Sequence, residues 1–253
     1  MEIFKIKIKN SISIEMLSIT TIWQLLFTIP FTIIALHSIK EYLKDREDSK
    51  KKHVCYAFSS FSIGFVLNLV GVLMIPFNMG PGERLLVCFL SRLFDIFNVI
   101  GLLWVFVFLA DFIEGMKKYL PFVFIHMAIT VIIIISTKTS IVIVGHEIVT
   151  GRPDIRALAI IVFWFFYWGI VALKFWKFSR LTANKVVMRR CQMMSVGAVF
   201  AISAYLAKIL SVAYQNLILH FSGEIFAAAA GVVFYIGFVV PEWMRRRWRN
   251  KFK

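Results

Sequence analysis

The sequence predicts an all-α integral membrane protein, a polytopic bundle of seven transmembrane helices. Of its 253 residues, 60% are hydrophobic and only 17% are charged, whereas an average soluble domain is about half apolar and about a quarter charged. The apolar residues also fall in continuous runs, without the alternation that is typical of barrel strands. Because helices satisfy their own backbone hydrogen bonds, they can cross lipid.

Seven apolar runs are long enough, or nearly so, for a hydrocarbon core of roughly 30 Å, which takes about 20 residues at about 1.5 Å each. They cover residues 16–39, 54–77, 85–112, 120–136, 157–175, 191–214 and 225–241. The first run is too long for a signal-peptide core and has no small-residue cleavage site. We therefore expect a single seven-helix domain over residues 1–253.

The longest predicted loop, residues 137–156, contains an apolar patch at 141–144. This patch predicts either a short hairpin or a strip that lies on the membrane surface.

Basic residues are distributed unevenly between the loops, and this asymmetry predicts the orientation. The loops after the first, third and fifth helices and the C-terminal tail contain twenty Lys and Arg residues, and the other side contains seven, with Arg156 and Glu224 assigned to its loops. Because Lys and Arg accumulate in short cytoplasmic loops, we expect a cell-membrane protein with its N-terminus outside and its C-terminus in the cytoplasm. Topology accounts for the formal net charge of +15, so we expect no nucleic-acid partner.

Three charged residues are assigned to no loop, namely Arg92 and Asp95 in the third helix and Lys208 in the sixth. Such residues are costly in lipid and usually mark a functional site or a buried pair. At about 1.5 Å per residue all three lie about 10–15 Å below the outer end of their helices. Asn98 follows Asp95 on the same helix face, and Asn68 lies at a similar depth in the second helix.

These five polar residues form the candidate ligand site, an outward-facing pocket with one excess positive charge. Such a pocket suits an anionic or carbonyl-bearing ligand. The alternative is a structural ion pair that joins the third and sixth helices, with the remaining charge snorkelling to the surface.

The C-terminal tail combines aromatic and basic residues in a pattern typical of an interfacial anchor. The residues of this anchor are Trp243, Arg245, Arg246, Arg247, Trp248 and Arg249. Aromatic rings lie at headgroup depth, and each basic residue gains about 1 kcal/mol against anionic lipid. We expect the bilayer and its anionic headgroups as partners; the alternative is docking of a cytoplasmic protein on the same surface.

The end of the seventh helix also resembles a known family. Its pattern Gly237-Phe238-x-x-Pro241-x-Trp243-x-Arg245 is similar to the one that closes the seven-helix sensor region at the N-terminus of many prokaryotic histidine kinases. In that family the pattern leads into cytoplasmic signalling domains, so the resemblance implies a sensor. Since the sequence ends four residues after Arg249, we expect a stand-alone sensor that signals to a separate cytoplasmic protein.

Other functional classes have less support in the sequence. The main alternative is a small-solute transporter that uses the Arg92, Asp95 and Lys208 charges. Retinal attachment, as in microbial rhodopsins, is not expected because the predicted seventh span contains no lysine. The sequence contains no recognisable nucleophile–base pair, carboxylate cluster or paired Cys or His spacing, so we expect neither an enzyme nor a bound metal or cofactor.

Overall fold

The structure, a computed structural model, describes residues 2–74, 81–113, 115–144, 147–151 and 154–250. Side chains are described for these residues except 2–20, 81, 83, 141–144, 147–151, 154 and 249–250. Within this part of the chain, seven helices are long and apolar enough to cross a membrane. This confirms the predicted seven-helix bundle and makes the chain an integral membrane protein.

Most of the helices extend beyond the predicted spans. The seven long helices are α1 (Glu2–Lys44), α2 (Ser49–Met74), α3 (Pro81–Phe112), α4 (Leu120–Ser136), α5 (Asp154–Leu181), α6 (Lys185–Ala213) and α7 (Leu217–Val239). The short elements are a 3-10 turn η1 (Lys117–Tyr119), two strands β1 (Ser140–Val144) and β2 (Glu147–Gly151), and a final helix α8 (Glu242–Asn250). Residues 75–77 of the second predicted span lie outside the described residues.

Side-chain caps fix where several helices begin. Asn184 precedes α6, and its Oδ1 atom accepts a hydrogen bond from Val186 N at 3.0 Å. Asn216 precedes α7 and accepts one from Leu219 N at 3.1 Å. Such caps satisfy backbone N–H groups that have no partner within the helix. The start of α7 is therefore set eight residues before its predicted span begins.

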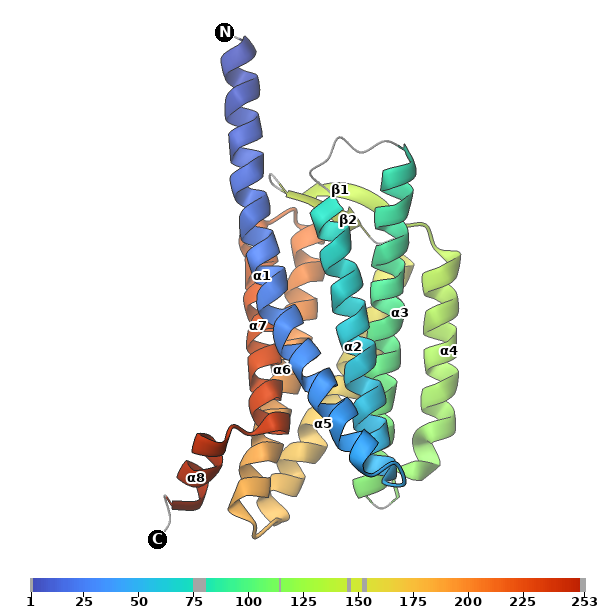
Figure 1. The fold of residues 1–253 in the computed structure, drawn as a ribbon. Coiled ribbons are helices and arrows are strands. Elements are labelled where there is room, and N and C mark those ends of the chain that lie inside the picture. The colour runs from blue at the N-terminus through green and yellow to red at the C-terminus, as the bar shows by residue number, and fades with distance from the viewer. Residues whose placement is uncertain (1, 75–80, 114, 145–146, 152–153, 251–253) are drawn as a thin grey trace.

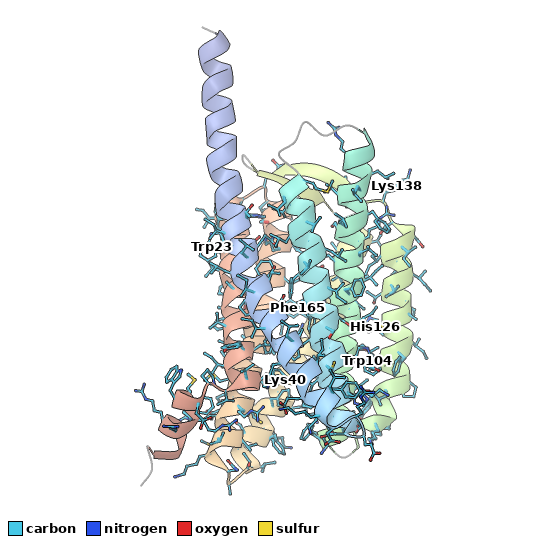
Figure 2. All side chains as sticks on the ribbon, in the orientation of Figure 1. Trp23, Lys40, Trp104, His126, Lys138 and Phe165 are labelled. Atoms are coloured by element: carbon cyan, nitrogen blue, oxygen red, sulfur yellow. The ribbon has the colours of Figure 1, made fainter. Side chains whose placement is uncertain are left out.

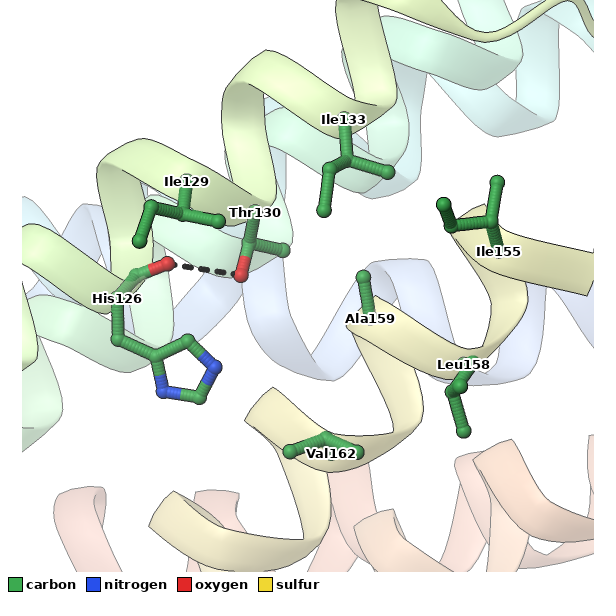
Figure 3. Close-up of a pocket in the computed structure, with 8 residues that line it drawn as sticks. All are labelled: His126, Ile129, Thr130, Ile133, Ile155, Leu158, Ala159 and Val162. Carbon is green, nitrogen blue, oxygen red and sulfur yellow. Dashed lines mark hydrogen bonds between the residues drawn. The ribbon is translucent and has the colours of Figure 1, made fainter.

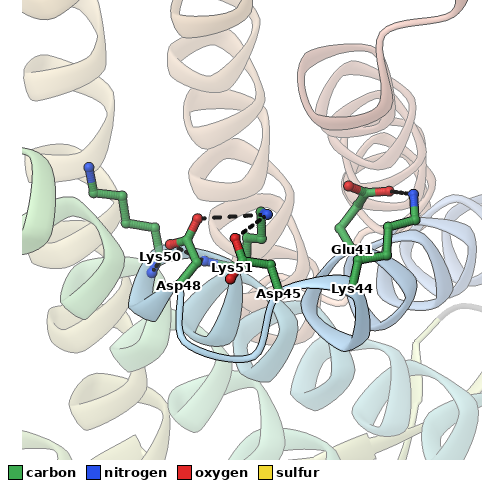
Figure 4. A network of polar contacts seen from close by, with 6 residues as sticks. All are labelled: Glu41, Lys44, Asp45, Asp48, Lys50 and Lys51. Atoms are coloured by element: carbon green, nitrogen blue, oxygen red, sulfur yellow. Dashed lines mark hydrogen bonds and ion pairs between the residues drawn. The ribbon is translucent and has the colours of Figure 1, made fainter.

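The turn between α1 and α2 is held by exposed polar contacts (Figure 4). Asp48 Oδ1 accepts a hydrogen bond from Lys50 N at 2.8 Å, next to the start of α2. Lys51 Nζ donates to Asp45 Oδ2 at 2.9 Å, and this bond lowers the pKa of the Asp45 carboxyl. Glu41 and Lys44 form a further pair at 2.6 Å.

Six of the long helices form a closed ring in the order α1, α2, α3, α5, α6 and α7, and α7 packs back against α1. α4 lies outside this ring, against α3 and α5 (Figure 1). We call the end of the bundle that carries α8 the α8 end, and the end that carries β1 and β2 the hairpin end. Lys40 lies towards the α8 end and Lys138 at the hairpin end (Figure 2).

β1 and β2 pair antiparallel, with Ser140 opposite Gly151 and Val142 opposite Val149. Of the two alternatives predicted for the apolar patch of the longest loop, the structure therefore shows the hairpin. The hairpin lies across the end of the bundle near the start of α3 (Figure 1).

Aromatic side chains fill the centre of the ring. Trp168 of α5 is 2% exposed, stacks on Phe61 of α2 at 6.0 Å and contacts Phe234 of α7 at 5.3 Å between ring centroids. Gly197 of α6 makes room for one of these rings, because a Cβ there would lie 2.8 Å from Phe234 Cδ1. Small residues of this kind let membrane helices approach closely, which here brings α6 and α7 together.

Candidate functional site

Asp95 of α3 forms an ion pair with a residue of α5. The Nη2 atom of Arg156 donates to Asp95 Oδ2 at 2.5 Å, and the two side chains are 0% and 1% exposed. Charged side chains that are buried in this way in a membrane protein are tolerated when they pair with each other. The contact therefore fastens α3 to α5.

Arg92 lies one helical turn before Asp95 and reaches the segment between α4 and β1. Its Nε atom donates to Thr139 Oγ1 at 3.2 Å, and Nη1 of Arg156 donates to the same oxygen. Thr139 thus joins two guanidinium groups. We call Arg92, Asp95, Arg156 and Thr139 the arginine cluster.

Asn98 lies one turn beyond Asp95 on α3 and is 2% exposed. Its Nδ2 atom donates to Phe94 O at 2.7 Å. A Cβ on Gly64 of α2 would lie 3.2 Å from this nitrogen, so Asn98 is part of the close contact between α2 and α3. Its Oδ1 atom has no hydrogen-bond partner among the described residues.

Lys208 of α6 pairs with Glu224 of α7. The Nζ atom donates to Glu224 Oε1, and the side chains are 30% and 1% exposed respectively. His220, one turn before Glu224, places its Nε2 atom 3.4 Å from Lys208 Nζ. The stem of Lys208 passes over Gly223, where a Cβ would lie 2.9 Å from Lys208 Cγ.

Two amides extend this pair to α1 and α2. Gln24 of α1 donates from Nε2 to Glu224 Oε1 at 3.2 Å, and Asn68 of α2 donates from Nδ2 to Gln24 Oε1 at 2.8 Å. Four helices therefore meet at Gln24, Asn68, Lys208, His220 and Glu224, which we call the lysine cluster. Its carboxylate keeps one oxygen, Glu224 Oε2, without a hydrogen-bond partner among the described residues.

The alternative interpretation, an ion pair that joins the third helix to the sixth, is wrong, and the expectation that Arg92, Asp95 and Lys208 line one pocket stays a prediction. Asp95 pairs with α5 and Lys208 with α7. The candidate residues are divided, with Asn68 and Lys208 in the lysine cluster, Arg92 and Asp95 in the arginine cluster, and Asn98 beside the latter. Binding of a ligand by these residues stays a prediction.

The one excess positive charge that the sequence predicts among the intramembrane residues is also found in the structure, which shows the residue that carries it. The two clusters contain three Lys and Arg cations and two carboxylates. Asp95 pairs with Arg156, and Glu224 pairs with Lys208. No carboxylate described in the structure lies within ion-pair distance of Arg92. The excess charge is therefore that of Arg92.

Sequence reasoning missed Arg156 and Glu224 as intramembrane partners because it assigned both to loops. Arg156 lies in the first turn of α5, and Glu224 lies two turns inside α7. A signal for Glu224 was available, since Asn216 directly precedes an apolar run and Asn is a common helix cap. Gln24 and His220 give no comparable signal in the sequence.

The C-terminal end of α7 is held by Arg190 of α6. Pro241 has no N–H, so the carbonyl of Gly237 lacks the donor that normally lies four residues later in a helix. Arg190 supplies donors instead, from Nε to Gly237 O at 2.9 Å and from Nη2 to Phe238 O at 3.1 Å. Val240 follows with a φ of 43°, a left-handed conformation that is strained for a β-branched residue.

α8 carries the predicted anchor residues beyond this turn, away from the bundle (Figure 1). Trp243 is 62% exposed, Arg246 and Arg247 are exposed, and Arg245 and Trp248 are partly buried. The side chain of Arg249 lies outside the described residues. Aromatic and basic groups are thus available at this end of the bundle, and their binding to lipid stays a prediction.

A groove of about 270 Å³ lies between α4 and α5 (Figure 3). It is lined by His126, Ile129, Thr130, Ile133, Ile155, Leu158, Ala159 and Val162. Two polar groups of this lining have partners within the protein: His126 Nδ1 lies 3.1 Å from Tyr167 Oη, and Thr130 Oγ1 donates to His126 O at 2.9 Å. The groove suits hydrocarbon and shares no residue with either cluster.

Comparison with known protein families finds no match for this chain, and no curated protein matches its sequence. The resemblance to kinase sensor regions therefore stays a prediction. Among the described residues, no group of three or more His, Cys, Asp or Glu side chains is placed to hold a metal ion.

The partners within the two clusters can be tested by double-mutant cycles. We expect Glu224→Gln alone to lower the free energy of unfolding by about 3–5 kcal/mol, as for a broken buried ion pair. Combined with Lys208→Met, it should show a coupling energy of about 1–3 kcal/mol. The measurement is reversible unfolding in detergent or bicelles.

The matched control is the cycle of Lys208→Met with Asp95→Asn, which should be additive within about 0.5 kcal/mol. Strong coupling between Asp95 and Lys208, with none between Lys208 and Glu224, would contradict the pairing described above.

Proposed function

We propose that the protein is a seven-helix sensor that binds a small ligand at the hairpin end and signals through α8 to a cytoplasmic protein. One observation carries this proposal: cationic side chains of α6 hold α7 at both ends. Lys208 holds Glu224 towards the hairpin end, and Arg190 holds the carbonyls of Gly237 and Phe238 at the α8 end.

These two contacts would couple the ends of the bundle. Gly237 follows Glu224 by 13 residues, which corresponds to about 20 Å along a helix. A ligand bound at the hairpin end that loosens the Lys208–Glu224 pair, directly or through α5, which packs on α6, would allow α7 to shift against α6. Packed helices shift between discrete arrangements. Since Arg190 binds the last turn of α7, such a shift would change the turn at Val240 and the direction of α8.

The proposal includes an orientation, with the hairpin end outside the cell and the α8 end in the cytoplasm. Residues 40–53, 113–119, 174–190 and 242–253, which comprise the loops after α1, α3 and α5 with the adjoining helix ends and the C-terminal segment, contain twenty of the 29 Lys and Arg residues. This favours a cytoplasmic location for them. On that side the rings and guanidinium groups of α8 would bind anionic headgroups, and a partner protein would dock on the same helix. The resemblance of the 237–249 segment to kinase sensor regions supports the same role.

Transport of a small solute is less well supported by the packing of the bundle. Between the two clusters and the α8 end, the centre is filled by the rings of Phe61, Trp168 and Phe234. The rings of Phe31 and Phe58, which are 5% and 1% exposed, also pack together in this region. A transport route would need polar groups through this region.

The sensor role predicts that the lysine cluster controls α8. A fluorophore is attached to a cysteine at Arg247 in a variant that lacks Cys55, Cys88 and Cys191. We expect Glu224→Gln to change the emission of this fluorophore at temperatures at which the protein is still folded. A coupling of about 1–3 kcal/mol would change the ratio of two α8 states by about 5- to 150-fold.

The matched control is Glu41→Gln, the same substitution at a partly exposed carboxylate near the α8 end, which should leave the emission unchanged. Identical spectra for the two variants would argue against transmission through α7. Uptake of solute into proteoliposomes that Glu224→Gln abolishes, without an α8 response, would favour the transporter.

The orientation has its own test. A membrane-impermeant maleimide added to intact cells should label a cysteine at Lys138, which is exposed at the hairpin end. A cysteine at Arg247 should react only after the cells are lysed. The reverse pattern would contradict the proposed orientation, and with it the cytoplasmic position of α8.

A further inference from the structure

The excess charge at Arg92 is associated with unused hydrogen-bond donors. Its Nε atom is bound to Thr139, but its two Nη groups make no hydrogen bond with any residue that the structure describes. Thr139 Oγ1 accepts from both Arg92 and Arg156, so the hydroxyl hydrogen must point away from the two guanidinium groups. Arg92 and Thr139 together therefore offer several donors next to a net positive charge.

We propose that Arg92 and Thr139 form a binding site for an oxyanion, a carboxylate or phosphate group, with Arg156 as a second cationic wall. A planar guanidinium matches the spacing of two oxygen atoms in such groups. The Asp95 carboxylate does not oppose this binding strongly, because Arg156 already pairs with it at 2.5 Å. An anion would also offset the repulsion between two guanidinium groups that share one hydroxyl.

The position of the site allows an anion to reach it. Thr139 follows the end of α4 by three residues, which places the cluster near the boundary of the membrane-spanning region. Arg92 is partly exposed, whereas Arg156 is fully buried. A soluble anion and the phosphate of a phospholipid headgroup have the same chemistry for this site.

The role of this anion as the ligand of the sensor rests on the proposed function. The binding itself does not, because an anion can bind whether or not α8 responds. Loss of anion binding with an intact α8 response to Glu224→Gln would overturn this inference alone. Anion binding without any α8 response would contradict the sensor alone.

The test is the thermal unfolding of purified protein in neutral detergent, titrated with inorganic phosphate against chloride of equal ionic strength. Phosphate at about tenfold excess over its dissociation constant should raise the unfolding midpoint by about 2–4 °C. Arg92→Gln should abolish this shift, measured from its own phosphate-free midpoint. Arg84→Gln is the matched control, since Arg84 is an exposed residue two turns earlier on α3, and it should keep the full shift.

Arg92→Lys provides a second variant if Arg92→Gln does not fold. It keeps the charge but loses the planar pair of donors, so phosphate should bind at least about tenfold more weakly than to the wild type. An unchanged affinity in this variant would overturn the proposal.

A parallel titration with phosphatidylglycerol, compared with phosphatidylcholine, identifies the source of the anion. Stabilisation by phosphatidylglycerol alone, lost in Arg92→Gln, assigns the site to a lipid headgroup. Stabilisation by inorganic phosphate assigns it to a soluble anion. No stabilisation by either, or equal shifts in Arg92→Gln and Arg84→Gln, would overturn the proposal.

Discussion

The structure depends on one constraint: charges placed within the bundle must find partners inside the protein, because lipid cannot solvate them. Two ion pairs meet this constraint, Asp95 with Arg156 and Lys208 with Glu224. Each pair joins two neighbouring helices of the ring, α3 with α5 and α6 with α7. The desolvation cost of such pairs makes them poor sources of net stability, and their main effect is to specify which helices lie side by side.

The α6–α7 contact illustrates how packing and polar bonds support each other. Gly197 and Gly223 let the two helices approach, one under Phe234 and the other under the stem of Lys208. At the far end, Pro241 leaves the Gly237 carbonyl without a helical donor, and Arg190 fills that place. The same proline that directs the chain into α8 therefore also creates the acceptor that ties α7 to α6.

Composition and periodicity were sufficient to predict seven helices, and to reduce the longest loop to two alternatives of which one was the hairpin, because both depend on local patterns. The excess of one positive charge within the membrane was also predictable. Arg156 and Glu224, which the sequence assigned to loops, add one positive and one negative charge to Arg92, Asp95 and Lys208, so the excess does not change. The pairing was not predictable, because it depends on which helices are neighbours and on where each helix starts. Lys208 and Asp95 have similar predicted depths in the membrane. However, α6, which carries Lys208, packs on α5 and α7, and the carboxylate that Lys208 contacts is Glu224 of α7. The start of α7 at Leu217, capped by Asn216, brings that residue into the bundle.

The most direct test of this account is an exchange of charges within the α6–α7 pair. Lys208→Glu alone and Glu224→Lys alone each place two like charges in contact, and both should lower the unfolding midpoint strongly. The double variant restores opposite charges in the same place, so it should recover at least about half of the stability lost by the worse single variant. If the double variant instead loses the sum of the two single effects, the two residues do not form the pair on which the arrangement of α6 and α7 depends.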